Sequence, residues 1–188
     1  MNQKMGLSRR NFLRNSALGI FGAALPAKIY QEKSEEKEKE QTLKVNNYRT
    51  LGRTGWKVSE IGGGYLGEEG LMNAMLDAGV NYIDTAESYP NQKIYGSVLK
   101  NRNRKEVFIT SKMQIKEDVS KEGFLERFKK CLEELQTDYI DCMMMHLPAK
   151  IEVLGTEGFH AAMQQLKTEG RLRFLGVSHH GSFWFKDP

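Results

Sequence analysis

Residues 79–89 have the sequence Gly79-Val80-Asn81-Tyr82-Ile83-Asp84-Thr85-Ala86-Glu87-Ser88-Tyr89. The first half, 80–83, is typical of a short buried strand, and Gly79 is suited to end a preceding helix. The second half is a polar loop that carries an acid, Asp84, and a phenol, Tyr89. A free phenol has a pKa of about 10, so it gives up a proton at neutral pH only when neighbouring groups favour ionisation. The stretch therefore predicts a strand-end site for moving a proton at a carbonyl group.

Strands and helices alternate along the body of the chain. After a small hairpin at 48–58, we expect strands at 59–63, 80–83, 107–111, 139–145 and 173–177, and helices at 68–78, 92–99, 120–135 and 157–167. The expected strands are almost continuously apolar, as in a parallel sheet with both faces covered. This order predicts an α/β fold built on a parallel sheet.

Three reactive side chains fall at equivalent places in this pattern. Asp84, Lys112 and His146 each follow the carboxyl end of a different expected strand, which is the catalytic rim of a (β/α)8 TIM barrel. A doubly wound sheet also binds ligands at strand carboxyl ends. However, Gly62-Gly63-Gly64 does not continue into the G-x-G-x-x-G turn expected of such a sheet. The pattern therefore favours the barrel.

The chain resembles the aldo-keto reductases from Tyr48 to about Gly181. The resemblance is carried, in order, by Tyr48-Arg49-Thr50-Leu51-Gly52-Arg53-Thr54-Gly55, residues 79–89, Ile109-Thr110-Ser111-Lys112, Asp138-Tyr139-Ile140-Asp141 with His146, and Gly176-Val177-Ser178. Each short segment alone is a weak signal. Five of them in the family's order and spacing are a strong one.

The resemblance implies a catalytic tetrad. Tyr89 would protonate the carbonyl oxygen while a nicotinamide delivers hydride, and the positive charge of Lys112 would ease the ionisation of the phenol. Asp84 would hold Lys112 through a salt link, and His146 would orient the carbonyl or assist the proton relay. Taken singly, each residue fits an ordinary role as a turn, packing, surface or structural side chain. Four coinciding at successive strand ends favour a site.

The resemblance also implies a cofactor and a substrate class. Ser178 and His179 stand where the family holds the nicotinamide carboxamide, although members usually have Asn at the position of His179. NADP(H) is the expected cofactor, with NAD(H) as the alternative. The expected partner is a small-molecule aldehyde or ketone.

The amino-terminal 27 residues predict an export signal. Ser8-Arg9-Arg10-Asn11-Phe12-Leu13 precedes a weakly apolar run at 17–27, which is shorter than the ~20 apolar residues of a membrane span. The paired arginines resemble a twin-arginine signal. We therefore expect a bacterial periplasmic or extracytoplasmic protein without a stable membrane span after cleavage. Residues 28–47 would be a charged linker. The alternative is an uncleaved basic tail.

Charge and cysteine content exclude other classes. The formal net charge of +4 arises in residues 1–27, which contain four basic residues and no acid, so residues 28–188 are neutral. The body has no basic cluster interleaved with aromatic residues, which argues against nucleic-acid binding. Cys131 and Cys142 lack metal-ligand spacing, and His179-His180 lacks a third ligand, so no metal site is expected. Both cysteines are expected to be small buried side chains, with a single disulfide as the alternative that their number allows.

The length limits how much of a barrel can form. A (β/α)8 barrel takes about 250 residues and rarely fewer than ~200, whereas 48–188 contains 141. We therefore expect 48–188 to be a partial aldo-keto reductase barrel, truncated after about the fifth strand. Two interpretations stay open: an NAD(P)H-dependent carbonyl reductase, or an inactive fragment that lacks the full cofactor site. A non-enzymatic ligand-binding barrel is disfavoured by the complete tetrad.

Overall fold

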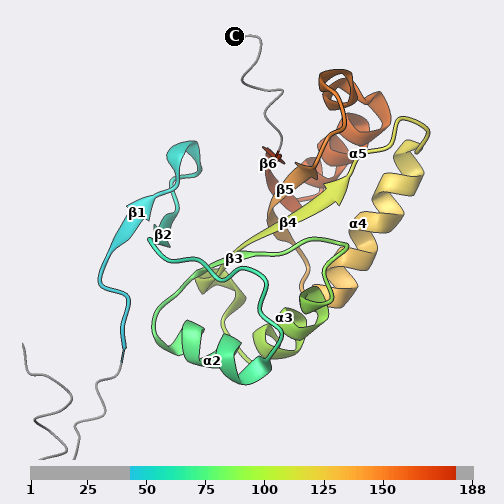
Figure 1. The fold of residues 1–188 in the computed structure, drawn as a ribbon. Helices are drawn as coiled ribbons and strands as arrows, with labels where there is room; N and C mark the ends of the chain where they lie inside the picture. The colour runs from blue at the N-terminus through green and yellow to red at the C-terminus, as the bar shows by residue number, and fades with distance from the viewer. Residues whose placement is uncertain (1–42, 181–188) are drawn as a thin grey trace, which may run out of the picture. The chain divides into compact units, whose positions relative to one another are not determined.

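A computed structural model of the chain describes residues 43–180 (Figure 1). Its strands are β1 (Tyr48–Thr50), β2 (Lys57–Ser59), β3 (Tyr82–Asp84), β4 (Phe108–Gln114), β5 (Ile140–His146) and β6 (Leu172–Ser178). Its α-helices are α2 (Glu69–Asp77), α3 (Asn91–Leu99), α4 (Lys121–Leu135) and α5 (Glu157–Thr168). Three short 3-10 helices are η1 (Gly52–Thr54), η2 (Arg104–Glu106) and η3 (Ile151–Gly155). The expected export signal and the larger part of the expected linker lie outside the described residues.

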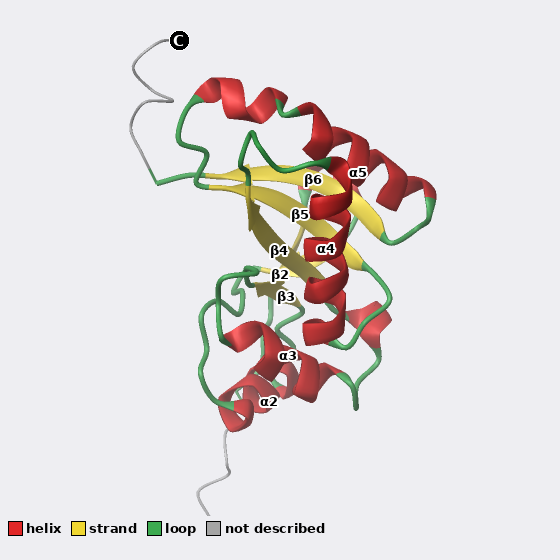
Figure 2. Ribbon diagram, turned by 90° about the vertical axis from the view of Figure 1, so that its right-hand side faces the viewer, coloured by secondary structure: helices red, strands yellow, loops and turns green. Residues whose placement is uncertain are grey.

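Four strands form a parallel sheet in the order β3-β4-β5-β6. Each strand lies beside the next one in the chain, and a helix connects each neighbouring pair. Figure 2 shows α3, α4 and α5 along one side of this sheet, where consecutive helices pack on one another. Neighbouring parallel strands with helices on one face are the arrangement of part of a (β/α)8 barrel wall. The expected fold class is confirmed.

Side-chain alternation divides the sheet residues between two apolar clusters. Ile109 and Met143 belong to the large core beneath the helices, together with Phe124, Phe128 and Phe159. The preceding residues on the same strands, Phe108 and Cys142, point to the opposite face, because successive side chains in a strand alternate. On that face the Trp56 ring from the β1–β2 hairpin packs edge-on against Phe108, with 5.7 Å between ring centroids. Apolar side chains thus pack on both faces of the sheet at β4 and β5, whereas Leu175 and Val177 of β6 are 37% and 47% exposed.

The hairpin at the start of the body is confirmed, but the strand expected directly after it is not. β1 and β2 pair in antiparallel fashion from Tyr48 opposite Ser59 to Thr50 opposite Lys57. Of the expected strand 59–63, β2 contains only Ser59, and Gly63 forms an isolated parallel bridge with Ile83. Three consecutive glycines at 62–64 explain the correction, because glycine weakens a strand and brings no side chain to pack.

Close backbone packing fixes the helices around Gly96. A Cβ atom at this position of α3 would lie 2.1 Å from the carbonyl oxygen of Glu134 in α4, so only glycine allows these two helices to approach so closely.

The helix α4 begins after Ser120, whose side chain accepts a hydrogen bond from the Gly123 amide at 3.2 Å. Within the described residues, no helix is both long and apolar enough to cross a membrane.

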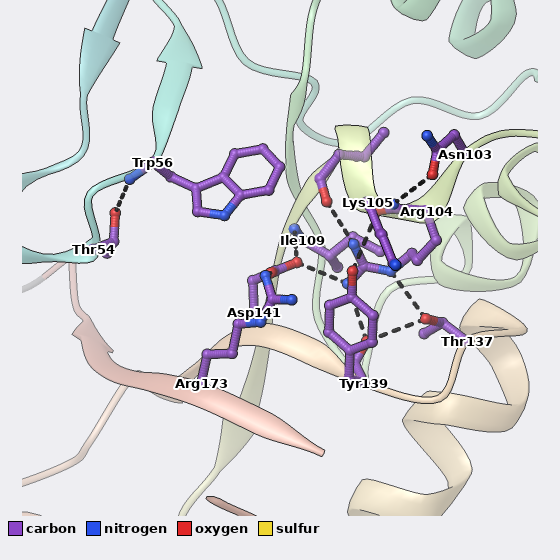
Figure 3. A network of polar contacts seen from close by, with 11 residues as sticks. Thr54, Trp56, Asn103, Arg104, Lys105, Ile109, Thr137, Tyr139, Asp141 and Arg173 are labelled. Atoms are coloured by element: carbon purple, nitrogen blue, oxygen red, sulfur yellow. Dashed lines mark hydrogen bonds and ion pairs between the residues drawn. The ribbon is translucent and has the colours of Figure 1, made fainter. Parts of the chain in front are cut away.

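A buried ionic network joins the amino-terminal ends of three strands (Figure 3). Asp141, the second residue of β5, has no exposed surface, and its carboxylate accepts hydrogen bonds from Arg104 and Arg173, both at 2.7 Å. It also accepts one from the Ile109 amide of β4 at 2.9 Å. Both guanidinium groups lie over the Tyr139 ring, 4.1 and 4.4 Å from its centroid. The network therefore ties η2, β4, β5 and β6 together.

Candidate active site

The carboxyl ends of β3, β4 and β5 bring the predicted site residues together. Asp84 is the last residue of β3 and His146 the last residue of β5. Lys112 was expected just past its strand, but it lies inside β4, which continues to Gln114 because residues 110–114 pair with 142–146 of β5. Tyr89 lies on the loop between β3 and α3. All four residues belong to one end of the parallel sheet.

Lys112 carries a buried positive charge next to Tyr89. Its side chain is only 6% exposed, and its ammonium group forms an ion pair with the Asp84 carboxylate. The ammonium also donates a hydrogen bond to the Thr85 carbonyl at 2.8 Å. A buried charge requires such partners. With them, the lysine nitrogen lies 4.9 Å from the centroid of the Tyr89 ring, so a fixed cation faces the phenol.

His146 also contacts Tyr89. The two rings meet edge to face, with 5.8 Å between centroids and an interplanar angle of 83°. Burial lowers the pKa of His146 from its usual value of 6.5, and the positive charges of Lys112 and His180 lower it further, against smaller opposing effects of Asp84 and Glu87. The imidazole is therefore neutral at pH 7. Its buried Nδ1 has no hydrogen-bond partner among the described residues.

The lowered pKa of His146 predicts a loss of stability in acid. Below about pH 6.5 an unfolded chain protonates this histidine while the folded protein resists it, so stability falls as the pH drops from about 6.5 toward the folded-state pKa. Above about pH 7.5 the contribution of His146 to the free energy of unfolding no longer changes with pH. Glutamine stays neutral at these pH values. We therefore expect the melting temperature of His146→Gln to fall less than that of the wild type when the pH is lowered from about 7.5 to 5.5. Equal losses in the two proteins, measured by thermal melts at both pH values, would contradict the assignment.

Three further residues at or next to this cluster were not predicted from the sequence. Tyr65, on the loop after Gly64, is 64% exposed and packs edge to face on Tyr89 with 5.5 Å between ring centroids. Glu87, two residues before Tyr89, forms an ion pair with Arg127 of α4. Glu87 lies within the stretch 79–89 that indicated the site, and its acidic side chain was the only available signal. Nothing in the sequence pattern links Arg127 to it.

Ser178 and His179 occupy the corresponding end of β6. Ser178 is the last residue of β6 and pairs in register with His146. Its carbonyl accepts a hydrogen bond from the Leu147 amide at 2.8 Å, which fixes the chain where it leaves the sheet. Ser178 and His179 are both half-buried. Their role in holding a nicotinamide stays a prediction.

The hollow at the candidate site is smaller than two others on the protein surface. A hollow of about 270 Å³ lies against Tyr89 and is bounded also by Glu87, Lys93 and Glu134. Two larger ones, of about 410 and 470 Å³, lie beside Gly79 and Tyr139 at the other end of the strands. The site is identified by its chemistry, because the buried cation, the phenol and the neutral imidazole converge only at the carboxyl end of the sheet within residues 43–180.

Comparison with known sequences finds the same family that the sequence motifs resemble. The sequence model of the Aldo/keto reductase family matches residues 68–184. The chain is 34% identical over 106 residues to "Methylglyoxal reductase DkgB" of Escherichia coli O157:H7, covering 55% of this chain and 39% of that protein. It is 34% identical over 152 residues to "Glyoxal reductase" of Bacillus subtilis (strain 168), covering 78% of this chain and 53% of that protein. The chain thus spans about half or less of the length of these curated relatives.

Solved structures resemble the fold over a similar share. Aldo-keto reductase AKR11C1 from Bacillus halodurans, in its holo form, superimposes with a TM-score of 0.63 at 32% identity. The match covers 75% of this chain and 53% of that one. A thermostable aldo-keto reductase, Tm1743, in complex with the inhibitor epalrestat, gives a TM-score of 0.62 at 28% identity. That match covers 71% of this chain and 54% of that one.

Proposed function

This chain belongs to the aldo/keto reductase family, and we propose on that premise that it reduces an aldehyde or ketone carbonyl with NADPH, Tyr89 being the acid. The observation that carries the proposal is the buried ammonium of Lys112, held 4.9 Å from the centroid of the Tyr89 ring by its bonds to Asp84 and Thr85. A phenol beside a fixed cation is the arrangement that proton donation to a carbonyl oxygen requires.

Each residue has a defined part in the reaction. Bound NADPH would supply the hydride that reduces the carbonyl carbon. Tyr89 gives its proton to the carbonyl oxygen, so that an alcohol forms and the phenolate that remains is stabilised by Lys112. Asp84 keeps Lys112 charged and oriented. The neutral imidazole of His146 donates a hydrogen bond to the carbonyl oxygen and orients it beside Tyr89.

The residues at the carboxyl end of β6 fit the nicotinamide part of the cofactor. Ser178 offers a hydroxyl group one strand away from His146. His179 offers an imidazole, which, like an amide, can both donate and accept hydrogen bonds. NADPH is proposed in preference to NADH because of the family resemblance.

The substrate class follows from the relatives. The proteins named methylglyoxal reductase and glyoxal reductase are each 34% identical to this chain over the matched residues. We therefore propose small reactive aldehydes as substrates, with methylglyoxal and glyoxal to be tested first.

The partial coverage of the relatives favours a second candidate. The matched residues span only 39% and 53% of these two curated proteins. In the second candidate, the chain is a catalytically inactive fragment of a reductase. It would hold the tetrad without a complete cofactor site.

One experiment separates the two candidates. The full chain is titrated with NADPH, binding is followed by cofactor fluorescence, and loss of absorbance at about 340 nm is then followed on addition of methylglyoxal or glyoxal. Saturable binding with carbonyl-dependent oxidation supports the reductase. A cooperative melt without binding or turnover supports the fragment. Lys112→Met should remove turnover, whereas Lys129→Met, on the exposed side of α4, should not.

Export is proposed from the sequence alone. The Arg9-Arg10 pair and the apolar run at 17–27 lie outside the described residues. Replacing both arginines with lysine should retain the protein in the cytoplasm of a bacterial host. Unchanged periplasmic recovery in cell fractions would contradict a twin-arginine signal.

A further inference from the structure

The loop that carries Tyr89 is attached to the end of β4 through Glu87. The backbone amides of Thr85 and Glu87 donate hydrogen bonds to the carbonyls of Thr110 and Lys112, both at 2.9 Å. The loop thus extends the pairing with β4 beyond the end of β3. Beyond Glu87 the main chain turns, with the Tyr89 amide bonded to the Ala86 carbonyl at 2.9 Å. Glu87 therefore lies inside the same turn as the proposed acid.

The side chain of Glu87 makes a second set of contacts. One carboxylate oxygen accepts a hydrogen bond from the Gln114 amide, at the last residue of β4, at 2.8 Å. Arg127 of α4 donates to both carboxylate oxygens, from Nε at 3.0 Å and from Nη2. The same Nη2 also donates to the Gln114 carbonyl at 2.7 Å. A planar guanidinium that bonds a carboxylate through two N–H groups fixes its orientation as well as its position.

Arg127 is itself held in place. Its guanidinium carbon lies 5.3 Å from the centroid of the Phe124 ring, one turn earlier on α4, and Phe124 is completely buried. The side chains of Arg127 and Glu87 are 26% and 20% exposed, so water competes only partly for their bonds. The contact therefore transmits the position of a rigid helix to the loop 85–89.

We propose that Arg127 and Glu87 form a clamp that positions the Tyr89 ring against the Lys112 ammonium and the His146 imidazole. Arg127 is a positioning residue, because its hydrogen bonds and ring contact join it to residues other than these three. Without Arg127, Glu87 keeps its backbone bond to Lys112 and the bond from the Gln114 amide, but it loses the two-pronged contact that fixes the orientation of its carboxylate. The consequence for catalysis rests on the proposed function, whereas the geometric claim does not.

The test compares Arg127→Gln with Lys129→Gln in the full chain. Both changes remove one cation from α4, but Lys129 is exposed and its ion pair is with Glu133 on its own helix. The first readout is the nuclear Overhauser effect between the ring protons of Tyr89 and His146, whose centroids are 5.8 Å apart. We expect it to be lost in Arg127→Gln and kept in Lys129→Gln. An unchanged effect in Arg127→Gln would overturn the clamp, even if the melting temperature fell.

Kinetics give a second and independent readout. A displaced Tyr89 should lower kcat about ten- to hundredfold in Arg127→Gln, with KM for the carbonyl substrate changed less than about twofold, because misplacement of a reacting group costs rate rather than binding. Arg127→Lys keeps the charge without the two-pronged contact and should recover only part of kcat. It also replaces Arg127→Gln if the latter does not fold. A rise in KM with kcat unchanged would overturn the proposal.

The two readouts separate this inference from the proposed function. If the wild type shows the ring contact but no turnover, the reductase assignment fails. Whether the clamp exists is then decided by the nuclear Overhauser effect between Tyr89 and His146 in Arg127→Gln. If the wild type turns over and Arg127→Gln matches it in kcat, the clamp fails and the reductase stands.

Discussion

Replacing Tyr89 with phenylalanine is expected to lower carbonyl-reductase turnover by about 10²- to 10⁴-fold, the range lost with a general acid. The change removes only the hydroxyl group. The ring keeps its edge-to-face contacts with His146 and Tyr65 and its place beside Lys112, so folding and NADPH binding should be unchanged. The measurement is kcat with methylglyoxal, from the oxidation of NADPH, together with a thermal melt on the same sample.

Tyr65→Phe is the matched control for this experiment. It removes a phenolic hydroxyl from the ring that packs directly on Tyr89, but this hydroxyl belongs to a side chain that is 64% exposed. Its turnover should stay within about threefold of the wild type. If Tyr89→Phe retained more than about a tenth of the wild-type kcat, another group would have to supply the proton. His146 would then be the next residue to replace.

The helices and the overall order of the sheet could be predicted from sequence because local patterns determine them. The apolar face of α4 repeats at helical spacing, and Ser120 caps its first turn, so its predicted start differs from the observed one by a single residue. Parallel order followed from alternation of strands and helices. Because the carboxyl ends of parallel strands share one edge, the pattern alone was enough to place Asp84, Lys112 and His146 together.

The boundaries that failed did so for physical reasons. β4 was predicted to end at Ser111, with Lys112 just past the strand. In the structure Lys112 stays inside the strand, since Asp84 and the Thr85 carbonyl satisfy its charge. The strand at 59–63 was overestimated because its glycines provide extended chain without side chains for packing.

Contacts between distant residues could not be predicted from one sequence. Glu87 and Arg127 are 40 positions apart, and Asp141 is 37 and 32 positions from Arg104 and Arg173. Such pairs leave no local periodicity. They arise only when α4 packs beside the loop 85–89, or when β6 pairs with β5. The sequence therefore identified the candidate site residues but not the residues that hold them in place.

Asp141→Asn is expected to lower the free energy of unfolding by about 3 kcal/mol, at the lower end of the 3–5 kcal/mol for breaking a buried ion pair. The variant keeps the shape of the side chain but loses its charge. Arg104 and Arg173, whose side chains are 16% and 40% exposed, then remain close together over Tyr139 without their shared counter-charge. Since small domains are stable by only about 5–15 kcal/mol, this is a large fraction. Urea denaturation of the full chain, compared at equal m-value, measures it.

Asp138→Asn provides the control, because Asp138 is exposed and only three residues away on the same segment. Its effect should stay within about 0.5 kcal/mol. Equal stability of the two variants would mean that the Asp141 network costs as much in desolvation as it gains. The network lies at the opposite end of the sheet from Lys112 and His146, so folded Asp141→Asn should retain the contact between the Tyr89 and His146 rings. A lost contact would show instead that the network also holds the site, and the stability and the geometry of this fold would then not be separable.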